Sequence, residues 1–267
     1  MALRICIGGA TGWTGQSLIE GVRKATDLAL TGAVARKSAG QAIGDIRVSA
    51  TVSEALAAGP TDVYIDYTHP SAVKANALAA LEAGVAVVVG TSGLDASDYA
   101  EIARVAERQG LGVVASGNFS LTAALLTRFS LMAASHLAEY EILDFSKSSK
   151  PDVPSGTAQE LSERMGRVRP SIPGVPIADI LGPKEARGAE VGGGRVHSVR
   201  LPGYVLAVET LFGLPGERLS IRHDAGSSAE PYVAGTLLAA RRVVALKGLT
   251  RGLDNLLFGA LEAEMRR

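Results

Sequence analysis

The amino-acid sequence predicts an α/β protein whose first region is a parallel β-sheet covered by helices on both faces. Two observations support this class: short apolar runs alternate with helical segments over residues 1–118, and the alternation stops after residue 118. Strands and helices that alternate at this spacing form βαβ units, which build parallel sheets. Hydrophobic residues make up 47% of the 267 residues, which is enough for a sizeable core.

The elements of the first region follow from apolar runs and from signals at helix ends. Pro70 suits the first turn of a helix that stops near Gly84, and Asp95 suits the N-cap of a helix that ends before Gly110. The apolar runs are short, as is typical of strands buried on both faces. We expect strands at 3–7, 28–35, 63–67, 85–89 and 111–115, and helices at 16–24, 70–81 and 96–109.

The middle of the chain is expected to have a different architecture. Pro and Gly cluster between residues 170 and 194, which indicates an extended loop, and Pro-Gly pairs separate the later strands. We expect helices at 121–137, 156–164 and 231–246, a strand at 141–145, and an antiparallel meander of strands at 195–200, 205–212 and 219–224. The predicted domains are a parallel α/β domain at 1–118, completed by 227–267, and a central α+β domain at 119–226.

Composition excludes several classes of protein. Lys and Arg number 27, as do Asp and Glu, and aromatic residues make up only 4%, which argues against nucleic acid as a partner. The single cysteine, Cys6, excludes an intramolecular disulfide framework and a cysteine-built zinc site, so we expect no metal and a reducing, cytoplasmic compartment. No apolar run reaches the roughly 18–20 residues of a membrane span, and the N-terminus lacks a secretory pattern, so no membrane partner is expected.

A glycine-rich segment between the first expected strand and the first helix predicts a dinucleotide site. Glycine permits positive φ and lets the backbone approach a pyrophosphate at a helix N-terminus. The alternative is a tight turn without a ligand. The expected cofactor-binding residues of this segment are Gly9, Thr11, Gly12, Trp13, Thr14 and Gly15.

The end of the second expected strand indicates which dinucleotide is bound. An acid at this position accepts the ribose 2′-hydroxyl of NAD, but here Arg36 and Lys37 follow the strand. A guanidinium can bind a 2′-phosphate with two hydrogen bonds, and the lysine adds charge. We therefore expect NADP(H) to be preferred, with NAD(H) possible. The alternative is that both are ordinary solvated charges.

Two further loops follow expected strands of the same sheet, where sheets of this kind bind ligands. Both are small and polar, so their backbone can approach the nicotinamide half of a cofactor. They contribute Gly90, Thr91, Ser92 and Gly93, and Ser116, Gly117, Asn118 and Phe119.

The segment from Ser146 to Thr157 carries the residues suited to an anionic substrate. Ser155 is a good N-cap, so Gly156 and Thr157 begin a helix and offer free backbone N–H groups to a carboxylate. Lys147 and Lys150 lie close by in the sequence, as counter-charges or proton donors. The alternative is a capped helix with surface lysines. Hydrolysis by a serine nucleophile is disfavoured because no G-x-S-x-G or S-x-x-K spacing occurs here.

The chain resembles the dihydrodipicolinate reductase family over nearly its whole length. The resemblance is most specific at residues 150–158, KPDVPSGTA, and includes residues 9–15, 66–68, 90–93, 117–120 and 216–223. It implies a Rossmann domain, a central domain that binds substrate and assembles a tetramer, and reduction of a cyclic, carboxylate-bearing substrate by NADH or NADPH. It further implies that Lys150 donates a proton, that Gly156 and Thr157 bind a carboxylate, and that Tyr67 and Thr68 lie at the cofactor.

Three positions depart from the pattern of this family. Ser146 and Lys147 stand where the family has adjacent histidines, the first of them regarded as the acid catalyst, and Glu209 stands where it usually has another. A hydroxyl is a poor general acid near neutral pH. The leading hypothesis is therefore a reductase of this family with a changed substrate, such as another carboxylated imine, enamine or conjugated C=C. The alternatives are an authentic 4-hydroxy-tetrahydrodipicolinate reductase and a non-catalytic NADP(H)-binding regulator.

Overall fold

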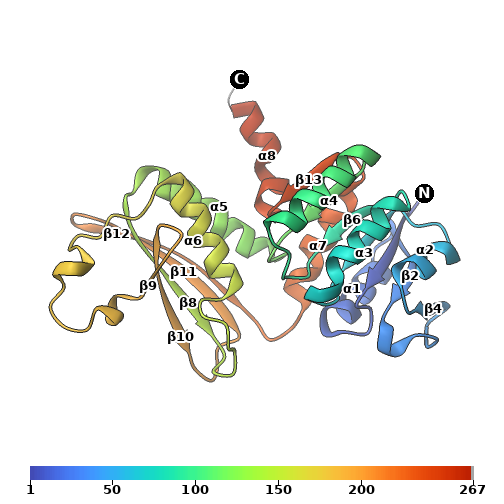
Figure 1. Ribbon diagram of the computed structural model, residues 1–267, viewed down its shortest axis with the longest axis horizontal. Helices are drawn as coiled ribbons and strands as arrows, with labels where there is room; N and C mark the ends of the chain where they lie inside the picture. The colour runs from blue at the N-terminus through green and yellow to red at the C-terminus, as the bar shows by residue number, and fades with distance from the viewer. Residues whose placement is uncertain (266–267) are drawn as a thin grey trace. The chain divides into compact units, whose positions relative to one another are not determined.

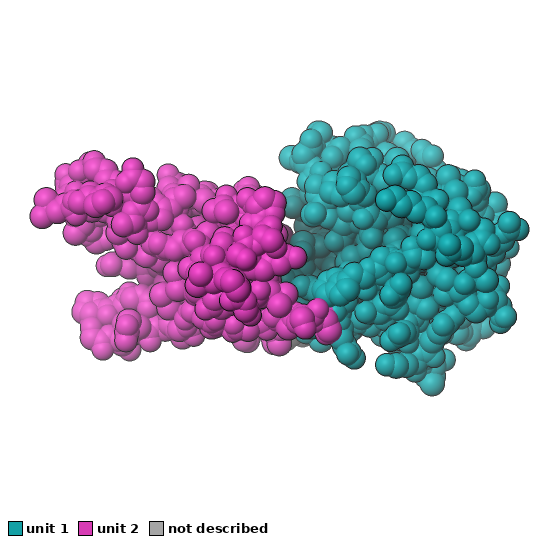
Figure 2. Space-filling view, turned by 90° about the horizontal axis from the view of Figure 1, so that it is seen from below, with its two compact units in different colours: residues 1–121, 229–267 teal, residues 122–228 magenta. Residues whose placement is uncertain are grey.

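A computed structural model describes residues 1–265 of the chain, which form two compact units (Figures 1 and 2). Unit 1 comprises residues 1–121 and 229–267, and unit 2 comprises residues 122–228. The predicted boundaries at 118 and 226 lie within a few residues of these divisions.

Unit 1 contains an eight-stranded sheet in the order β13-β7-β6-β5-β1-β2-β4-β3, and the predicted doubly wound α/β fold is confirmed. The pairs that join β13 through β4 are parallel, and β3 pairs antiparallel with β4. Its strands are β1 (Leu3–Gly8), β2 (Leu28–Val34), β3 (Ala42–Ile43), β4 (Ile46–Ser49), β5 (Val63–Asp66), β6 (Ala86–Val89), β7 (Gly112–Ala115) and β13 (Gly248–Arg251).

Helices cover both faces of this sheet because its strands are apolar on both sides. Side chains of α2, α3 and α4 pack in one core with alternate strand residues such as Cys6, Tyr64 and Val87. Helices α1 and α7 pack against each other, α1 also against β1 and β2, and α7 against β5, β6 and β7. The helices of unit 1 are α1 (Trp13–Lys24), α2 (Val52–Ala58), α3 (Pro70–Glu82), α4 (Ala96–Gln109), α7 (Glu230–Val243) and α8 (Leu253–Met265), with a 3-10 turn, η1 (Arg36–Ser38).

Unit 2 contains a five-stranded sheet in the order β12-β11-β8-β10-β9, and two helices cover one of its faces. Ile142, Val196 and Val208 point to that face and pack with Leu126 of α5 and Leu161 of α6. The elements are α5 (Leu121–His136), β8 (Glu139–Ser146), α6 (Gly156–Val168), η2 (Ile177–Asp179), η3 (Lys184–Arg187), β9 (Ala189–Val191), β10 (Gly194–Arg200), β11 (Leu206–Leu214) and β12 (Glu217–Ala225).

The expected three-stranded antiparallel meander is wrong in one respect. β11 and β12 form an antiparallel hairpin, but β10 pairs in parallel with β8, which lies between β10 and β11. The Pro202-Gly203 pair is therefore part of a crossing over the end of β8, where the Leu201 N–H donates to the Ser146 carbonyl over 3.1 Å. A turn signal shows where the chain reverses, but it does not show which strand lies beside the next.

Several short elements of the structure were not predicted from the sequence. Strands β3, β4, β9 and β13 and helices α2 and α8 were not expected. The structure confirms helix signals that were expected. Pro70 begins α3, Asp95 caps the start of α4 through a capping box, and Gly110 is the C-cap of α4 with φ 68°. Helix α1 begins at Trp13, earlier than the expected residue 16, and therefore starts directly at the glycine loop.

Close packing of two backbones generates a prediction about Gly166 in α6. A Cβ at Gly166 would lie 1.8 Å from the Gly192 carbonyl oxygen, whereas a Cβ at Gly213 of β11 meets nothing within 4 Å. Glycine to alanine inside a helix ordinarily stabilises by about 1 kcal/mol. We expect Gly166→Ala instead to destabilise unit 2 by roughly 1–3 kcal/mol, because backbone atoms must move.

Urea unfolding followed by circular dichroism measures this effect, with Gly213→Ala as the matched control in the same unit. The control is expected to retain the parent midpoint. A Gly166→Ala midpoint at or above that of the parent would contradict the close approach.

Candidate functional site

The carboxyl ends of the parallel strands bring the predicted cofactor residues to one edge of unit 1. Gly8, at the end of β1, lies opposite Val34 and Asp66, at the ends of β2 and β5. Asp66 lies opposite Val89 of β6, which lies opposite Ala115 of β7. The loops that follow these strands, residues 9–15, 35–38, 67–69, 90–93 and 116–119, therefore lie along the same edge, which we name the cofactor edge.

The glycine loop at this edge is compact because its glycines contact other backbone atoms. Gly9 has φ 75°, and a Cβ there would lie 2.0 Å from the Tyr67 carbonyl oxygen. A Cβ at Gly15 would lie 2.1 Å from the Gly9 carbonyl oxygen. Gly12 is the N-cap of α1 and has no side chain to accept a hydrogen bond from the helix. The first N–H groups of α1 are therefore open to an anion. The loop fits the pyrophosphate of a dinucleotide.

Arg36 and Lys37 lie on η1, directly after β2, and both are exposed. The Ser38 hydroxyl donates to the Thr11 hydroxyl oxygen over 3.3 Å, which joins this turn to the glycine loop. The Gly9 N–H donates to the Val34 carbonyl over 2.9 Å, which fixes the same pair of loops at their bases. The two cations therefore lie on a turn that is joined to the glycine loop, and their role toward a 2′-phosphate stays a prediction.

A buried carboxylate, Asp66, joins two more loops of the cofactor edge. It is 0% exposed and accepts hydrogen bonds from the hydroxyls of Tyr64, Thr68 and Thr91, at 2.7, 2.8 and 2.6 Å, and from the Asn76 amide at 3.0 Å. The Thr68 N–H also donates to Asp66 over 3.0 Å. The side chains of Thr68 and Thr91 are thus turned toward Asp66 and connect the loops after β5 and β6.

Aromatic side chains at the edge serve packing. The Tyr67 hydroxyl lies 2.8 Å from the Thr236 hydroxyl of α7, and a Cβ at Gly90 would lie 2.2 Å from the Tyr67 ring. Burial raises the pKa of Tyr67 above its usual value, so this phenol is neutral. Phe119 is 1% exposed, and its ring centroid lies 6.3 Å from that of Tyr67. The Tyr67 hydroxyl and the Phe119 ring are therefore occupied by contacts within unit 1, and the role of both residues at a cofactor stays a prediction.

The remaining predicted cofactor residues lie in the turns after β6 and β7 and in the first turn of α1. The Ser116 hydroxyl donates to the Asn118 carbonyl over 2.8 Å, so it closes its own turn. Gly93 has φ 99°, and a Cβ there would lie 2.5 Å from the Pro70 side chain. Trp13 begins α1 and is followed by Thr14, and the exposed indole of Trp13 lies edge-on to the Tyr232 ring. Ser92 and Gly117 are exposed.

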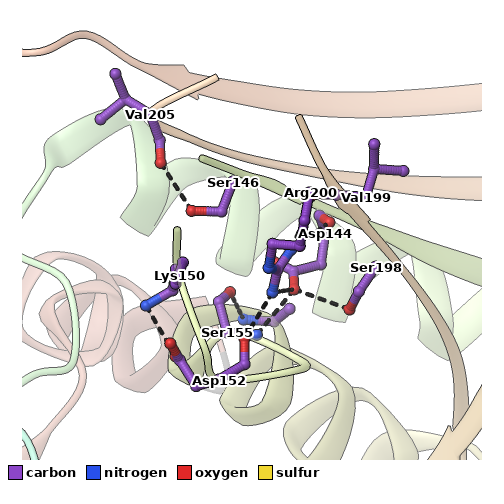
Figure 3. Close-up of polar contacts among 10 residues, drawn as sticks. Asp144, Ser146, Lys150, Asp152, Ser155, Ser198, Val199, Arg200 and Val205 are labelled. Carbon is purple, nitrogen blue, oxygen red and sulfur yellow. Dashed lines mark hydrogen bonds and ion pairs between the residues drawn. The ribbon is translucent and has the colours of Figure 1, made fainter. Parts of the chain in front are cut away.

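The predicted substrate residues gather in unit 2 between β8 and α6 (Figure 3), and we name residues 146–157 the substrate turn. Ser155 caps α6, because its hydroxyl accepts from the Ala158 N–H over 3.3 Å. Gly156 is exposed, and a Cβ there would meet nothing within 4 Å. The backbone N–H groups of Gly156 and Thr157 therefore begin the helix at an open position, which suits a carboxylate.

The two predicted lysines and Ser146 differ in their surroundings. The Lys150 ammonium lies 2.8 Å from an Asp152 carboxylate oxygen, with 27% of its side chain exposed. Lys147 is exposed. Ser146 is 1% exposed, and its hydroxyl donates to the Val205 carbonyl over 2.9 Å (Figure 3). This hydrogen bond occupies the only proton of the Ser146 side chain, and its catalytic role stays a prediction.

Glu209 lies away from the other departures from the family pattern. Its neighbours Val208 and Thr210 point to the helix-covered face of the sheet, where Asp144 and Ser146 also lie. Glu209 therefore points to the opposite face, where it pairs with Arg222 over 3.0 Å.

Sequence reasoning missed the residues that hold the substrate turn. Asp144 is 0% exposed, and one of its carboxylate oxygens accepts from the Ser155 N–H at 2.8 Å, the Ser198 hydroxyl at 3.0 Å and the Arg200 guanidinium at 2.8 Å. Burial acts to raise the pKa of Asp144, but the hydrogen bonds from Ser155 and Arg200 outweigh it and lower the pKa. The sequence signal that could have identified Asp144 is the period-two alternation of the strand, which places Asp144 on the same face as the apolar Ile142.

Two negative findings concern the part of the chain that the structure describes. Among the side chains that it describes, no group of three or more from His, Cys, Asp or Glu is placed to hold a metal ion. None of the helices that the structure describes has the length and apolarity needed to span a membrane.

The doubly wound sheet, its glycine loop and the open helix N-terminus of unit 2 together define an NAD(P)-dependent oxidoreductase. The family model described as "Dihydrodipicolinate reductase, N-terminus" matches residues 3–119, and the corresponding C-terminal model matches residues 122–257. The chain belongs to the dihydrodipicolinate reductase family.

Individual relatives match over nearly their full length. The 4-hydroxy-tetrahydrodipicolinate reductase of Moorella thermoacetica is 37% identical over 265 residues, covering 96% of this chain and 98% of the relative. That of Mycolicibacterium smegmatis is 37% identical over 256 residues, covering 96% and 99%. A solved dipicolinate-bound dihydrodipicolinate reductase from Paenisporosarcina sp. TG-14 has a TM-score of 0.85 and 29% identity, covering 96% of this chain and 99% of that one.

The lowered carboxyl pKa values generate a prediction about stability in acid. Hydrogen bonds from Arg4 lower the pKa of Asp62, and that of Asp144 is lowered as described above. In the unfolded chain both carboxyls have a pKa of about 3.9, so the unfolded state binds protons first as the pH falls. The stabilisation is complete above this value and is lost as the pH falls through the folded pKa values.

We expect the free energy of unfolding in urea to fall between pH 5 and pH 3, by up to about 1.4 kcal/mol per pH unit for each such carboxyl. Asp62→Asn should remove part of this slope, since Asp62 then no longer titrates. A slope equal to that of the parent would contradict the assignment for Asp62.

Proposed function

We propose that the protein reduces a C=N bond or a conjugated C=C bond in a small cyclic substrate that carries a carboxylate. The observation that carries this proposal is the substrate turn, where the open N–H groups of Gly156 and Thr157 begin α6. A negative group is stabilised there by unpaired donors and by the helix dipole. Lys150 lies a few residues away in the same turn, as a cation with ammonium protons to donate.

In this proposal the residues of the chain have separate tasks. Bound NADPH supplies the hydride that forms the new C–H bond. Gly156 and Thr157 hold the substrate carboxylate, and Ser155 keeps their N–H groups in place by capping α6. Lys150 donates a proton to the substrate nitrogen, or to the carbanionic carbon of a conjugated C=C, so that hydride and proton together complete the reduction. Asp152 pairs directly with Lys150 and so holds its ammonium group in place within the turn.

We further propose that the substrate differs from 4-hydroxy-tetrahydrodipicolinate. This part rests on Ser146 and Lys147, at positions where the family pattern quoted above has histidines. The Ser146 hydroxyl is buried and donates its hydroxyl proton to the Val205 carbonyl, so we assign the acid to Lys150 instead. Lys147 adds a positive charge at the same turn, which favours a substrate with more negative charge or a different ring.

A second candidate is the reaction that the relatives' names state, reduction of 4-hydroxy-tetrahydrodipicolinate, which the family resemblance assigns to lysine biosynthesis. It is favoured by 37% identity to the Moorella thermoacetica reductase across 96% of this chain. Under this candidate, Lys150 serves as the acid without a histidine.

The discriminating experiment compares substrates at saturating NADPH. We expect kcat/KM for freshly generated 4-hydroxy-tetrahydrodipicolinate to be exceeded by that for another member of a panel of carboxylated cyclic imines, enamines and enoates. Lys150→Ala should lower kcat by about 100-fold or more on the preferred substrate, because the proton donor is lost, and leave the Kd for NADPH unchanged.

Each outcome of this comparison is informative. Highest activity on the lysine-pathway substrate would select the second candidate. NADPH binding without turnover of any panel member would favour a regulator and reject both reductase candidates. Unchanged turnover in Lys150→Ala would reject the role of the lysine.

We also propose that NADPH is preferred over NADH, because Arg36 stands exposed after β2, where a 2′-phosphate would lie beside the glycine loop. Arg36→Ala should raise the Kd for NADPH by about tenfold and leave that for NADH nearly unchanged, since only NADPH carries the extra charge. Fluorescence titration of both cofactors measures this difference. An equal loss for the two cofactors would contradict the assignment.

The remaining expectations stay proposals. A homo-oligomer, a tetramer by the family resemblance, is supported by exposed apolar side chains on the β11–β12 hairpin, namely Leu211, Leu214 and Leu219. A reducing, cytoplasmic compartment is supported by the single, buried cysteine.

A further inference from the structure

We infer that Arg200 and Asp144 form a buried clamp that positions Lys150 and the carboxylate-binding N–H groups at the same time. The inference rests on the proposed function of the substrate turn and goes beyond it, because neither clamp residue belongs to that turn. Arg200 ends β10, and Asp144 lies near the end of β8 (Figure 3). Both therefore belong to a rigid sheet, whereas Lys150 lies in a connection between a strand and a helix.

The first arm of the clamp holds the start of α6. The Ser155 N–H donates to the Asp144 carboxylate over 2.8 Å, and the Ser155 hydroxyl caps the helix. The next residues along the chain are Gly156 and Thr157. The position of their N–H groups is thus determined by a carboxylate that is 0% exposed.

The second arm holds the segment that bears the lysine. One terminal nitrogen of Arg200 donates both to the Asp144 carboxylate and to the Asp152 carbonyl, each over 2.8 Å. The Asp152 side chain in turn pairs with Lys150 over 2.8 Å. A continuous series of contacts therefore leads from Asp144 through Arg200 and Asp152 to the ammonium group.

The geometry requires a guanidinium. The second terminal nitrogen of Arg200 donates to the Asp144 carbonyl at 3.1 Å and to the Val199 carbonyl at 3.0 Å, so the planar group spans several acceptors. An ammonium is a compact charge without this fork, and it cannot reach the same set of acceptors. Residues 147–149 and 151–153 are exposed, so the Arg200 contact with Asp152 joins an otherwise solvated segment to the sheet.

Arg200→Lys is the appropriate variant because it keeps the charge opposite the buried Asp144 and removes only the fork. Deleting the arginine outright would leave a buried carboxylate without its counter-ion, which usually destabilises strongly. Arg222→Lys is the matched control: Arg222 is also a doubly paired arginine of this sheet, but it pairs with Glu209 and Asp224 on the opposite face.

The test combines hydrogen exchange with kinetics. In the apo protein, Arg200→Lys should speed amide exchange of peptides covering residues 147–157, and Arg222→Lys should not. On the preferred substrate, Arg200→Lys should lower kcat by roughly 10–100-fold and raise the substrate KM, while the Kd for NADPH stays unchanged. In a Lys150→Ala background, Arg200→Lys should cause little further loss of kcat, because the group that it positions is already absent.

The possible results separate the clamp from the proposed function. Unchanged exchange at residues 147–157 overturns the clamp, whatever the enzyme reduces. Faster exchange with unchanged kcat and KM, or full additivity with Lys150→Ala, overturns its role in catalysis. A parent protein that reduces no panel substrate rejects the proposed function, and exchange alone then decides whether the clamp orders the segment.

If Arg200→Lys does not fold, the paired variant Asp144→Asn with Arg200→Met removes both buried charges together and is expected to fold. It should show the same local increase in exchange. Parent-like exchange in this variant would overturn the clamp.

Discussion

Each candidate site depends on hydrogen bonds to the carboxylate of a buried aspartate near the carboxyl end of a strand. Loops that bind ligands lack the hydrogen-bond ladders of helices and sheets, so other groups must hold them. Asp66 does this at the cofactor edge with neutral donors from β5, α3 and the loops after β5 and β6. Asp144 does it in unit 2, where hydrogen bonds from Ser155 and Arg200 outweigh the effect of burial and lower the pKa of Asp144 below its usual value. In each case the rigid sheet determines where a flexible segment lies.

The two sites use the same physical means to attract negative groups. Each site includes a helix N-terminus, where the first N–H groups have no partners within the helix. Each site also has cationic side chains in a segment that leads to that N-terminus or is joined to it. At α1 these are Arg36 and Lys37, and at α6 they are Lys147 and Lys150. A chain with zero net charge can therefore select anionic ligands, because local placement of charge and not total charge determines the field at a site.

The elements that could be predicted are those in which local signals and tertiary packing agree. The β-branched runs of β5, β6 and β7 are buried from both sides, and α3 and α4 have clear end signals. The parallel pairing of β10 with β8 was missed because a Pro-Gly pair looks the same in a hairpin turn and in a crossing over a third strand. The short β3, β4 and β13 were missed because two to four residues carry too little pattern to separate a strand from a loop.

The sequence by itself determined the α/β class, the glycine loop, the cations after β2 and the capped turn at Ser155, because each depends on residues that are neighbours along the chain. Only the tertiary structure decided which residues hold these segments and which partner receives the hydroxyl proton of Ser146. It turned the Ser146 hydroxyl to the Val205 carbonyl, brought Arg200 to Asp152 across 48 positions, and placed Glu209 on the far face of its sheet. The physical reason is that strand order and side-chain burial bring distant residues together, and a local pattern of residue types contains no information about those partners.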